Sequence, residues 1–162
     1  MPQAKRIPLS DRKNATPPRD FRGWLLDQAR ALRKLEGQVA QLDCAELAEE
    51  LEGMARSDER AAESLLENLL THLLKWRYQP QRQTRSWRAS IQNARSDLRN
   101  LLADSPNLKP RLPPLTARAY EKARRTVGAE MDLDHREWEK KSPRACPWQS
   151  DFLLRDFWPD AD

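Results

Sequence analysis

The chain has 162 residues, of which 38% are hydrophobic and 33% are charged, and it contains two cysteines. Its 23 leucines and 19 alanines stand against only two valines and two isoleucines. Because strands favour β-branched residues and helices favour Ala and Leu, this composition excludes a sheet protein and predicts an all-α fold. The composition also excludes collagen-like and disulfide-stapled chains, and no apolar run approaches the ~18 residues of a membrane span.

The net charge of +4 is distributed unevenly. Residues 1–19 carry +4, residues 20–74 carry −6, residues 75–125 carry +10 and residues 126–162 carry −4. This segregation has two interpretations. Either acidic and basic helices pair within the fold, or the basic middle presents a surface for phosphate groups or an acidic partner.

The N-terminal stretch differs in character from the rest. Residues 1–19 contain four prolines and almost no large apolar side chain, which predicts a flexible basic Pro-rich arm followed by a single helical domain over residues 20–159. The first helix is predicted from about Asp20 to Glu36, with Asp20 as its cap and Gly37 ending it in the left-handed conformation. The apolar residues that recur at helical spacing in it are Trp24, Leu25, Ala29, Leu32 and Leu35.

The second predicted helix is the longest. It begins near Asp43, which can cap it, and continues without proline to Gln79, before Pro80 stops it. A helix of that length spans roughly 50 Å, and we expect one continuous central helix rather than two.

Two more helices and a C-terminal turn complete the prediction. A third helix is predicted from Thr84 to Ala103, and a fourth from Pro113-Pro114 to Met131. The side of the third helix opposite its apolar stripe carries Arg88, Arg95 and Arg99, and it is expected to face solvent. Beyond the fourth helix lies a polar stretch containing Trp138 and Trp148, and the aromatic-rich residues 151–159 are expected to dock as one short turn. The predicted fold class is therefore an all-α helical bundle built on one long central helix, with a short C-terminal aromatic turn.

One polar pattern lies near the end of the long helix. Asn68, His72, Lys75 and Gln79 advance by four, three and four residues and so share one side of it. The simplest interpretation is a histidine at the edge of the core, hydrogen-bonded to Asn68. The pair Asn68-x-x-x-His72 also resembles part of the motif of the small helical RNases of the higher-eukaryote-and-prokaryote nucleotide-binding family. That motif has an arginine where Glu67 stands here, so the resemblance implies at most a degenerate RNase-like fold.

A second pattern mixes aromatic and basic residues around the turn at Pro80. Single-stranded nucleic-acid binders use such residues to stack bases and contact phosphates. In the alternative interpretation, Trp76 and Trp87 face each other across the turn as core, while the arginines pair with the acidic half. Together the two patterns give these candidate binding residues: Asn68, His72, Lys75, Trp76, Tyr78, Arg85, Trp87 and Arg88.

Few residues are available for metal or redox chemistry. Only His72 and His135 are present, and Cys44 and Cys146 are about a hundred residues apart, so we predict no metal site, no cofactor and no assigned catalytic residue. The scarcity of cysteines and the lack of a recognisable signal segment favour a cytoplasmic protein without a structural disulfide.

Several short motifs occur in order between residues 20 and 159. They are Leu47-Ala-Glu-Glu-Leu51, Met54-Ala-Arg56-Ser57-Asp58, His72-Leu-Leu-Lys75-Trp76-Arg-Tyr78-Gln-Pro80, Ser86-Trp87, Asp104-Ser105-Pro106, Ala119-Tyr120, Cys146-Pro147-Trp148 and Asp156-Phe157-Trp158-Pro159. In this order they resemble the bacterial family known as domain of unknown function twenty-nine. The resemblance implies an almost wholly helical single-domain protein, and it implies no activity, cofactor or catalytic residue.

The sequence favours a non-enzymatic interaction or regulatory module that binds another macromolecule, a protein before others, through residues 75–125. The alternatives are a nucleic-acid-binding protein that uses this same basic region, and the degenerate RNase-like fold centred on Asn68 and His72. A homodimer is a further expectation, because a long helix exposes an apolar stripe that a second copy can cover.

Overall fold

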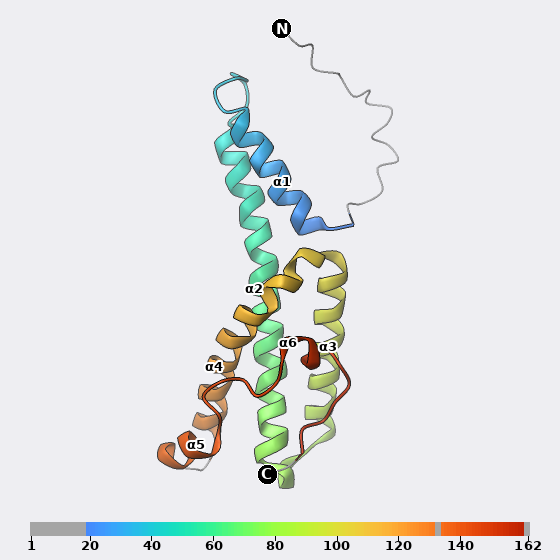
Figure 1. The fold of residues 1–162 in the computed structure, drawn as a ribbon, viewed down its shortest axis with the longest axis vertical. Helices are drawn as coiled ribbons and strands as arrows, with labels where there is room; N and C mark the ends of the chain where they lie inside the picture. The colour runs from blue at the N-terminus through green and yellow to red at the C-terminus, as the bar shows by residue number, and fades with distance from the viewer. Residues whose placement is uncertain (1–18, 132–133, 161–162) are drawn as a thin grey trace.

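The computed structural model describes residues 19–131 and 134–160, so the predicted arm lies outside the described residues except for Arg19. Within these ranges all regular structure is helical, and no strand occurs. The elements, in chain order, are α1 (Phe21–Lys34), α2 (Cys44–Tyr78), η2 (Pro80–Arg82), α3 (Arg85–Asp104), η3 (Pro106–Arg111), α4 (Leu112–Glu130), α5 (His135–Lys141) and α6 (Ser150–Leu153) (Figure 1). The predicted all-α fold class is confirmed.

α2 is one continuous helix of 35 residues, about 52 Å long. Its first turn is capped by Asp43, whose carboxylate accepts a hydrogen bond from the backbone N of Glu46 at 2.9 Å. The helix ends at Tyr78, two residues before Pro80, because proline has no N–H to continue the ladder. The three most extensive contacts between elements are those of α2 with α1, α3 and α4. This confirms α2 as the central helix.

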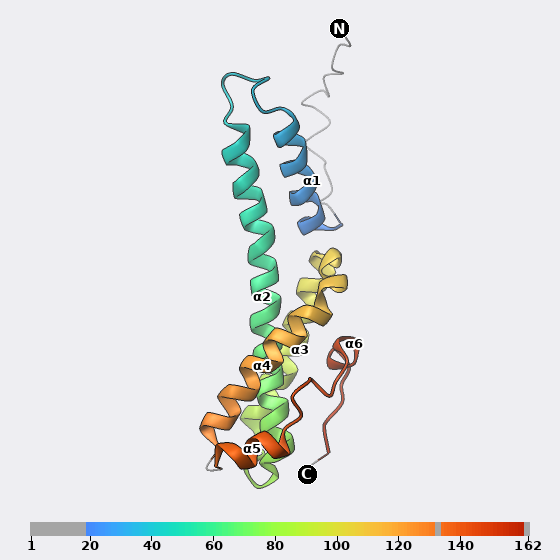
Figure 2. The same ribbon diagram turned by 60° about the vertical axis from the view of Figure 1, so that its left-hand side comes forward.

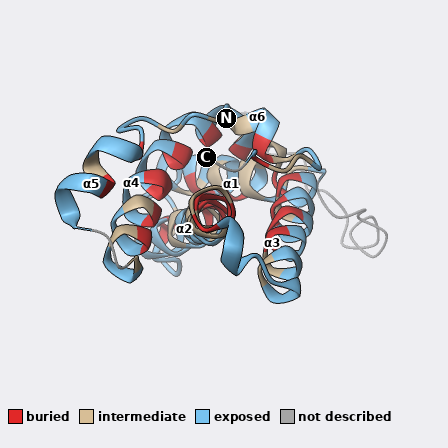
Figure 3. Ribbon diagram, turned by 90° about the horizontal axis from the view of Figure 1, so that it is seen from below, coloured by how far each residue is buried: buried red, intermediate tan, exposed pale blue. Residues whose placement is uncertain are grey.

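The two ends of α2 are covered differently (Figures 1 and 2). α1 runs antiparallel to the N-terminal half of α2, and this α1–α2 hairpin extends away from the rest of the molecule. α3 and α4 pack against the C-terminal half, where the buried residues face inward toward α2 (Figure 3). This main core is rich in leucine and includes Leu66, Leu69, Leu70, Leu73, Leu74, Leu98, Leu108 and Leu115. None of the described helices combines the length and apolar character that crossing a membrane requires.

α1 follows its prediction in its cap and its ending. The Asp20 side chain accepts from the backbone N of Gly23 at 3.0 Å, and Gly37 adopts a φ of +73°, where a Cβ would be strained. The apolar residues predicted in this helix do not all face the same way, however. Leu25 and Ala29 are buried against α2, whereas Trp24 is 43% exposed.

The prediction that Arg95 faces solvent is wrong. Arg95 is completely buried, and it donates hydrogen bonds from Nε to the carbonyl oxygen of Leu153 at 3.1 Å and from Nη2 to that of Phe157 at 2.7 Å. Its guanidinium carbon also lies 4.8 Å from the centroid of the Phe157 ring. The physical reason is that the C-terminal segment, residues 150–159, crosses α3 and covers this side of it. Arg88 and Arg99 remain exposed, as predicted.

The region after α4 is more ordered than its polar sequence indicates, since it contains the short helix α5. Trp138 in α5 is only 2% exposed, and its indole Nε1 donates to the carbonyl oxygen of Arg124 at 2.9 Å. Its ring packs against Gly128 so closely that a Cβ there would lie 2.4 Å from the indole Cδ1. The predicted docking of the C-terminal aromatic turn is also found, with Leu153 fully buried in the main core.

Candidate interaction site

His72 and Asn68 are joined within α2. His72 Nδ1 lies 2.9 Å from the backbone oxygen of Asn68, and because a carbonyl only accepts, Nδ1 is the donor. The imidazole is half-buried and the Asn68 side chain is exposed. The partner of His72 is therefore the Asn68 backbone, one helical turn earlier, which matches an edge histidine more closely than a pair of converging side chains.

The aromatic residues around Pro80 are paired with the C-terminal segment. Trp76 is buried, and its ring centroid lies 4.6 Å from that of Trp158, so Trp158, and not Trp87, is the ring against which it packs. Lys75 forms an ion pair with Glu130 of α4, and its Nζ lies 6.0 Å from the Trp87 centroid. These contacts tie α2 to α3, α4 and the C-terminal segment at one level of the molecule.

The remaining candidates separate into two places. Arg88 lies over two rings, with its guanidinium carbon 5.8 Å from the Trp76 centroid and 5.4 Å from that of Trp158. Tyr78 points instead toward α5, where its hydroxyl donates to the carbonyl oxygen of Lys141 at 3.2 Å. Arg85 is exposed at the first position of α3. The structure thus brings Trp76 and Arg88 together, with Lys75 and Trp87 beside them, but not all eight candidates.

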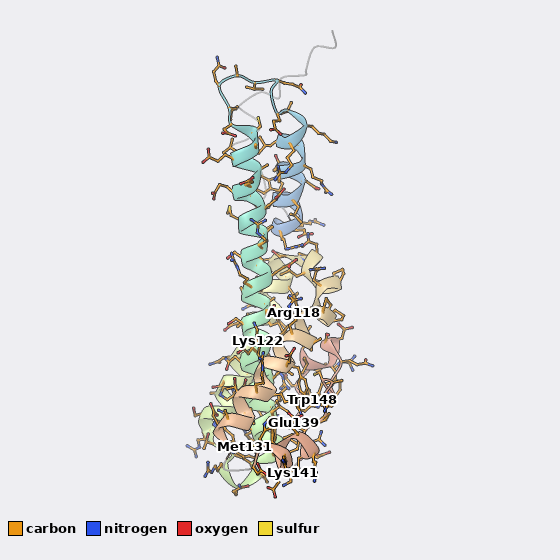
Figure 4. All side chains as sticks on the ribbon, turned by 90° about the vertical axis from the view of Figure 1, so that its left-hand side faces the viewer. Arg118, Lys122, Met131, Glu139, Lys141 and Trp148 are labelled. Carbon is orange, nitrogen blue, oxygen red and sulfur yellow. The ribbon has the colours of Figure 1, made fainter. Side chains whose placement is uncertain are left out.

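Much of the basic charge of residues 75–125 is used inside the fold. Glu63 of α2 accepts hydrogen bonds from Lys122 Nζ at 2.6 Å and from Arg118 Nε at 3.0 Å, and Figure 4 shows both basic side chains on α4 beside α2. Glu59, one turn earlier, accepts from Arg111 Nε at 3.3 Å. The hydrogen bond from Lys122, reinforced by the one from Arg118, holds the pKa of the Glu63 carboxyl below its usual value. Here acidic and basic helices pair internally.

The α1–α2 hairpin is held by a narrow seam of buried residues. In α2 these residues are Cys44, Ala48 and Ala55, and in α1 they are Leu25 and Ala29. Their spacing of four or seven residues fits a coiled coil, in which one side of each helix faces its partner. The small alanine side chains allow a close approach but give little apolar burial. The start of α1 also contacts η3, and among the described residues no other helix packs extensively against the remaining sides of the hairpin.

The large exposed apolar residues of the hairpin fall on one side of it. In α1 they belong to the stripe Phe21, Trp24, Gln28, Ala31 and Leu35, and in α2 to the stripe Leu47, Leu51 and Met54. Members of each stripe immediately precede seam positions, as Trp24 precedes Leu25 and Met54 precedes Ala55. In an antiparallel helix pair, equal offsets from the seam point to the same face, so the two stripes are adjacent.

We call this surface the hairpin apolar face and define it by its five largest exposed side chains. Their exposed fractions are 38% for Phe21, 43% for Trp24, 44% for Leu35, 41% for Leu47 and 47% for Met54. The rings of the first two stack with centroids 6.1 Å apart.

The opposite face of the hairpin is charged. Arg33 of α1 donates from Nε to Glu52 of α2 at 3.0 Å, and Arg56 lies 3.9 Å from the same carboxylate. Arg56 follows the seam residue Ala55, whereas Met54 precedes it, and the Arg33–Glu52 contact lies on the same side as Arg56, so the hairpin has one charged and one apolar face. The apolar face was missed from sequence, although the run of Trp and Leu at helical spacing in α1 is a signal that could have indicated it. Among the described residues, no three His, Cys, Asp or Glu side chains lie together in a way that could hold a metal ion.

Three comparisons place the chain among known proteins. A crystal structure of an α-helical protein of unknown function from Rhodospirillum rubrum is similar in fold, with a TM-score of 0.68 and 22% sequence identity over 89% of this chain and 92% of that one. The comparison with curated proteins gave no match. The family model described as Domain of unknown function DUF29 matches residues 18–158, which is most of the chain. The chain therefore belongs to the DUF29 family.

Proposed function

We propose that this protein is a non-enzymatic interaction module that binds another polypeptide chain through the hairpin apolar face. The observation that carries the proposal is the gathering of Phe21, Trp24, Leu35, Leu47 and Met54 on one side of a projecting two-helix hairpin. Scattered apolar residues are normal on protein surfaces, but a contiguous apolar patch bordered by polar residues is typical of a protein-binding site. Trp and Met are also among the residues enriched in such interfaces.

The basic residues 75–125 support binding less well than the sequence alone indicates. Arg111, Arg118 and Lys122 are engaged by carboxylates of α2, and Lys75 is engaged by Glu130. A phosphate-binding surface needs cations that are free to replace counterions, and these four are already neutralised by neighbours. We therefore place the proposed site on the hairpin.

Photo-cross-linking in the cells from which the sequence comes tests the proposal. A photoreactive amino acid is introduced at position 54 on the hairpin apolar face and, as a control, at position 56 on the charged face. We expect a cross-linked product with a second polypeptide from position 54 and little from position 56. Equal labelling from both positions, or none from position 54, would contradict the proposal.

A further inference from the structure

We infer that the polypeptide bound by the hairpin apolar face is a second copy of this chain, which forms a two-fold dimer in which two hairpins pack as a four-helix bundle. This inference rests on the proposed function and names its partner. A two-helix hairpin buries only the single seam between its helices, whereas two hairpins placed face to face also bury the surfaces between them. The structure supplies three features that suit a copy of the same surface.

The first feature is that the α1 stripe is symmetrical about its centre. Gln28 lies seven residues from Phe21 and seven from Leu35, so a two-fold axis at Gln28 places each of these apolar residues opposite the other in the copy. The aromatic end of one α1 then meets the aliphatic end of its partner. Two antiparallel helices related by this axis form a closed two-fold dimer, which is the commonest symmetry of homo-oligomers.

The second feature is that the α2 stripe also has a centre, at nearly the same height as Gln28, so one two-fold axis serves both helices. Leu47 and Met54 are centred between Glu50 and Leu51, and the axis at that level pairs Leu47 with Met54 of the copy. Two contacts bracket the relative height of the two helices: Arg22 Nε with the carbonyl oxygen of Ala55 near one end of α1, and Arg33 Nε with Glu52 near the other. Taken as the average of these two contacts, the heights of the two centres differ by about two to three residues. The centres therefore lie within about one helical turn of each other.

The third feature is that the stripes carry no charge. A two-fold contact brings residues near the axis close to their own copies, so a charged residue there meets a like charge. Neither the α1 stripe nor the α2 stripe contains a charged residue. The polar residue at the centre, Gln28, has an amide that both donates and accepts, so its two copies can hydrogen-bond across the axis. Glu50 lies farther round α2, at the edge of the contact.

The contact that two such faces can form is small. Two helices side by side over the length of α1 present a face about 20 Å long and 20 Å wide, so a dimer buries on the order of 1,000 Å² in total. That area is at the lower end of specific interfaces, where weak and transient complexes are found. We therefore expect a reversible dimer, with a dissociation constant on the order of 10 µM.

Sedimentation velocity of the full chain over a range of concentrations tests this inference. We expect the 18.9 kDa monomer well below about 10 µM and a species of twice that mass well above it. The double variant Trp24→Glu/Met54→Glu puts four like charges into the contact and should stay monomeric throughout. Arg56→Glu changes the charge on the opposite face of the same helix and should dimerise as the original chain does.

Two further measurements show whether a variant is monomeric because it does not fold. Circular dichroism checks that the variants are helical. If the glutamate variants do not fold, Met54→Ala replaces them, because it adds no charge, and it should weaken the dimer at least tenfold.

A chain that remains monomeric at every concentration, or a double variant that dimerises like the original, would overturn the inference. If the chain is monomeric while position 54 cross-links to a different protein in cells, the second copy is rejected and the proposed function stands. If position 54 cross-links to nothing, both fail.

Discussion

Replacing Arg95 with alanine should release the C-terminal segment from α3. The guanidinium donates to the backbone oxygens of Leu153 and Phe157, at 3.1 and 2.7 Å, in a site that excludes solvent. Without it, two carbonyls of the C-terminal segment lose their donor, and the cation–aromatic contact with Phe157 is also lost. The segment then keeps only exposed charged contacts with α3, which are the Arg99–Asp156 ion pair and Arg88 over the Trp158 ring.

The magnitude follows from these contacts. Hydrogen bonds to a charged group contribute roughly 1.5–3 kcal/mol each, and a buried acceptor left unpaired costs a similar amount. Two factors reduce the sum: Nη1 of Arg95 has no hydrogen-bond partner among the described residues, and burial lowers the pKa of the guanidinium, which shows that the buried charge carries a desolvation cost. We expect Arg95→Ala to lower the free energy of unfolding by about 3 kcal/mol.

Urea denaturation measures how much Arg95→Ala lowers the free energy of unfolding. Limited trypsin digestion shows whether the C-terminal segment is released, because Arg155 offers a cleavage site within it. Arg99→Ala is the matched control. Arg99 is one turn further along α3, exposed, and paired with Asp156 at 3.1 Å, so its removal should cost less than about 1 kcal/mol and leave cleavage after Arg155 slow. If Arg95→Ala costs no more than the control, or if cleavage after Arg155 is not accelerated, Arg95 does not anchor the segment.

Three other predictions concern α4, its contact with α2, and the half-buried thiol of Cys146. Gly128→Ala should destabilise the protein by about 1–3 kcal/mol in urea unfolding, because the new methyl group collides with Trp138; a gain in stability, as helix propensity alone would give, would contradict the close packing. Burial raises the pKa of the Cys146 thiol, so its alkylation by iodoacetamide at pH 8 should be slower than that of glutathione and keep rising above pH 9. A rate that levels off below pH 8.5 would refute this. Because the pKa of Glu63 is lowered in the folded state, its pairing with Lys122 stabilises the protein above the usual carboxyl pKa and ceases to do so as pH falls through the folded-state pKa. The stability difference between the original chain and Glu63→Gln should therefore be present at pH 7 and shrink as the pH is lowered below the usual carboxyl pKa, and a difference that does not change with pH would point to packing instead.

The parts of the fold that could be predicted are those set by local sequence. The uninterrupted run from Asp43 to Pro80 determines the central helix, since capping and the proline stop act within a turn of each end. Gly37 likewise reports a backbone conformation that other residues adopt at a cost. These signals need no knowledge of the rest of the chain.

The parts that could not be predicted depend on segments remote in sequence. An arginine on the polar side of a helix is expected to face water, and nothing near Arg95 shows that residues 58 and 62 positions later will cover it. The burial of Trp138 could not be predicted for the same reason. Its ring packs against Gly128 and donates to the carbonyl oxygen of Arg124, and both of these residues belong to α4.

The candidate interaction site shows a different limit. The spacing of the apolar residues of α1 predicts one stripe, but a helix turns by about 100° per residue, so Trp24 and its neighbour Leu25 cannot both face the same partner. Only the position of α2 decides which of them is buried. Sequence therefore indicates that α1 has more apolar surface than one partner helix can cover, and the structure shows where the excess lies.

The covering of Arg95 by the C-terminal segment also constrains how the protein is made. A ribosome synthesises α3 well before residues 150–159, and the growing chain cannot bury this arginine until that segment has left the exit tunnel. The burial of Arg95 therefore follows the synthesis of residues 150–159, whereas the helices themselves can form earlier. A product that lacks residues 150–159 would display an uncovered Arg95 on α3, together with the apolar surface that Leu153 covers, and cellular quality control can distinguish such a surface.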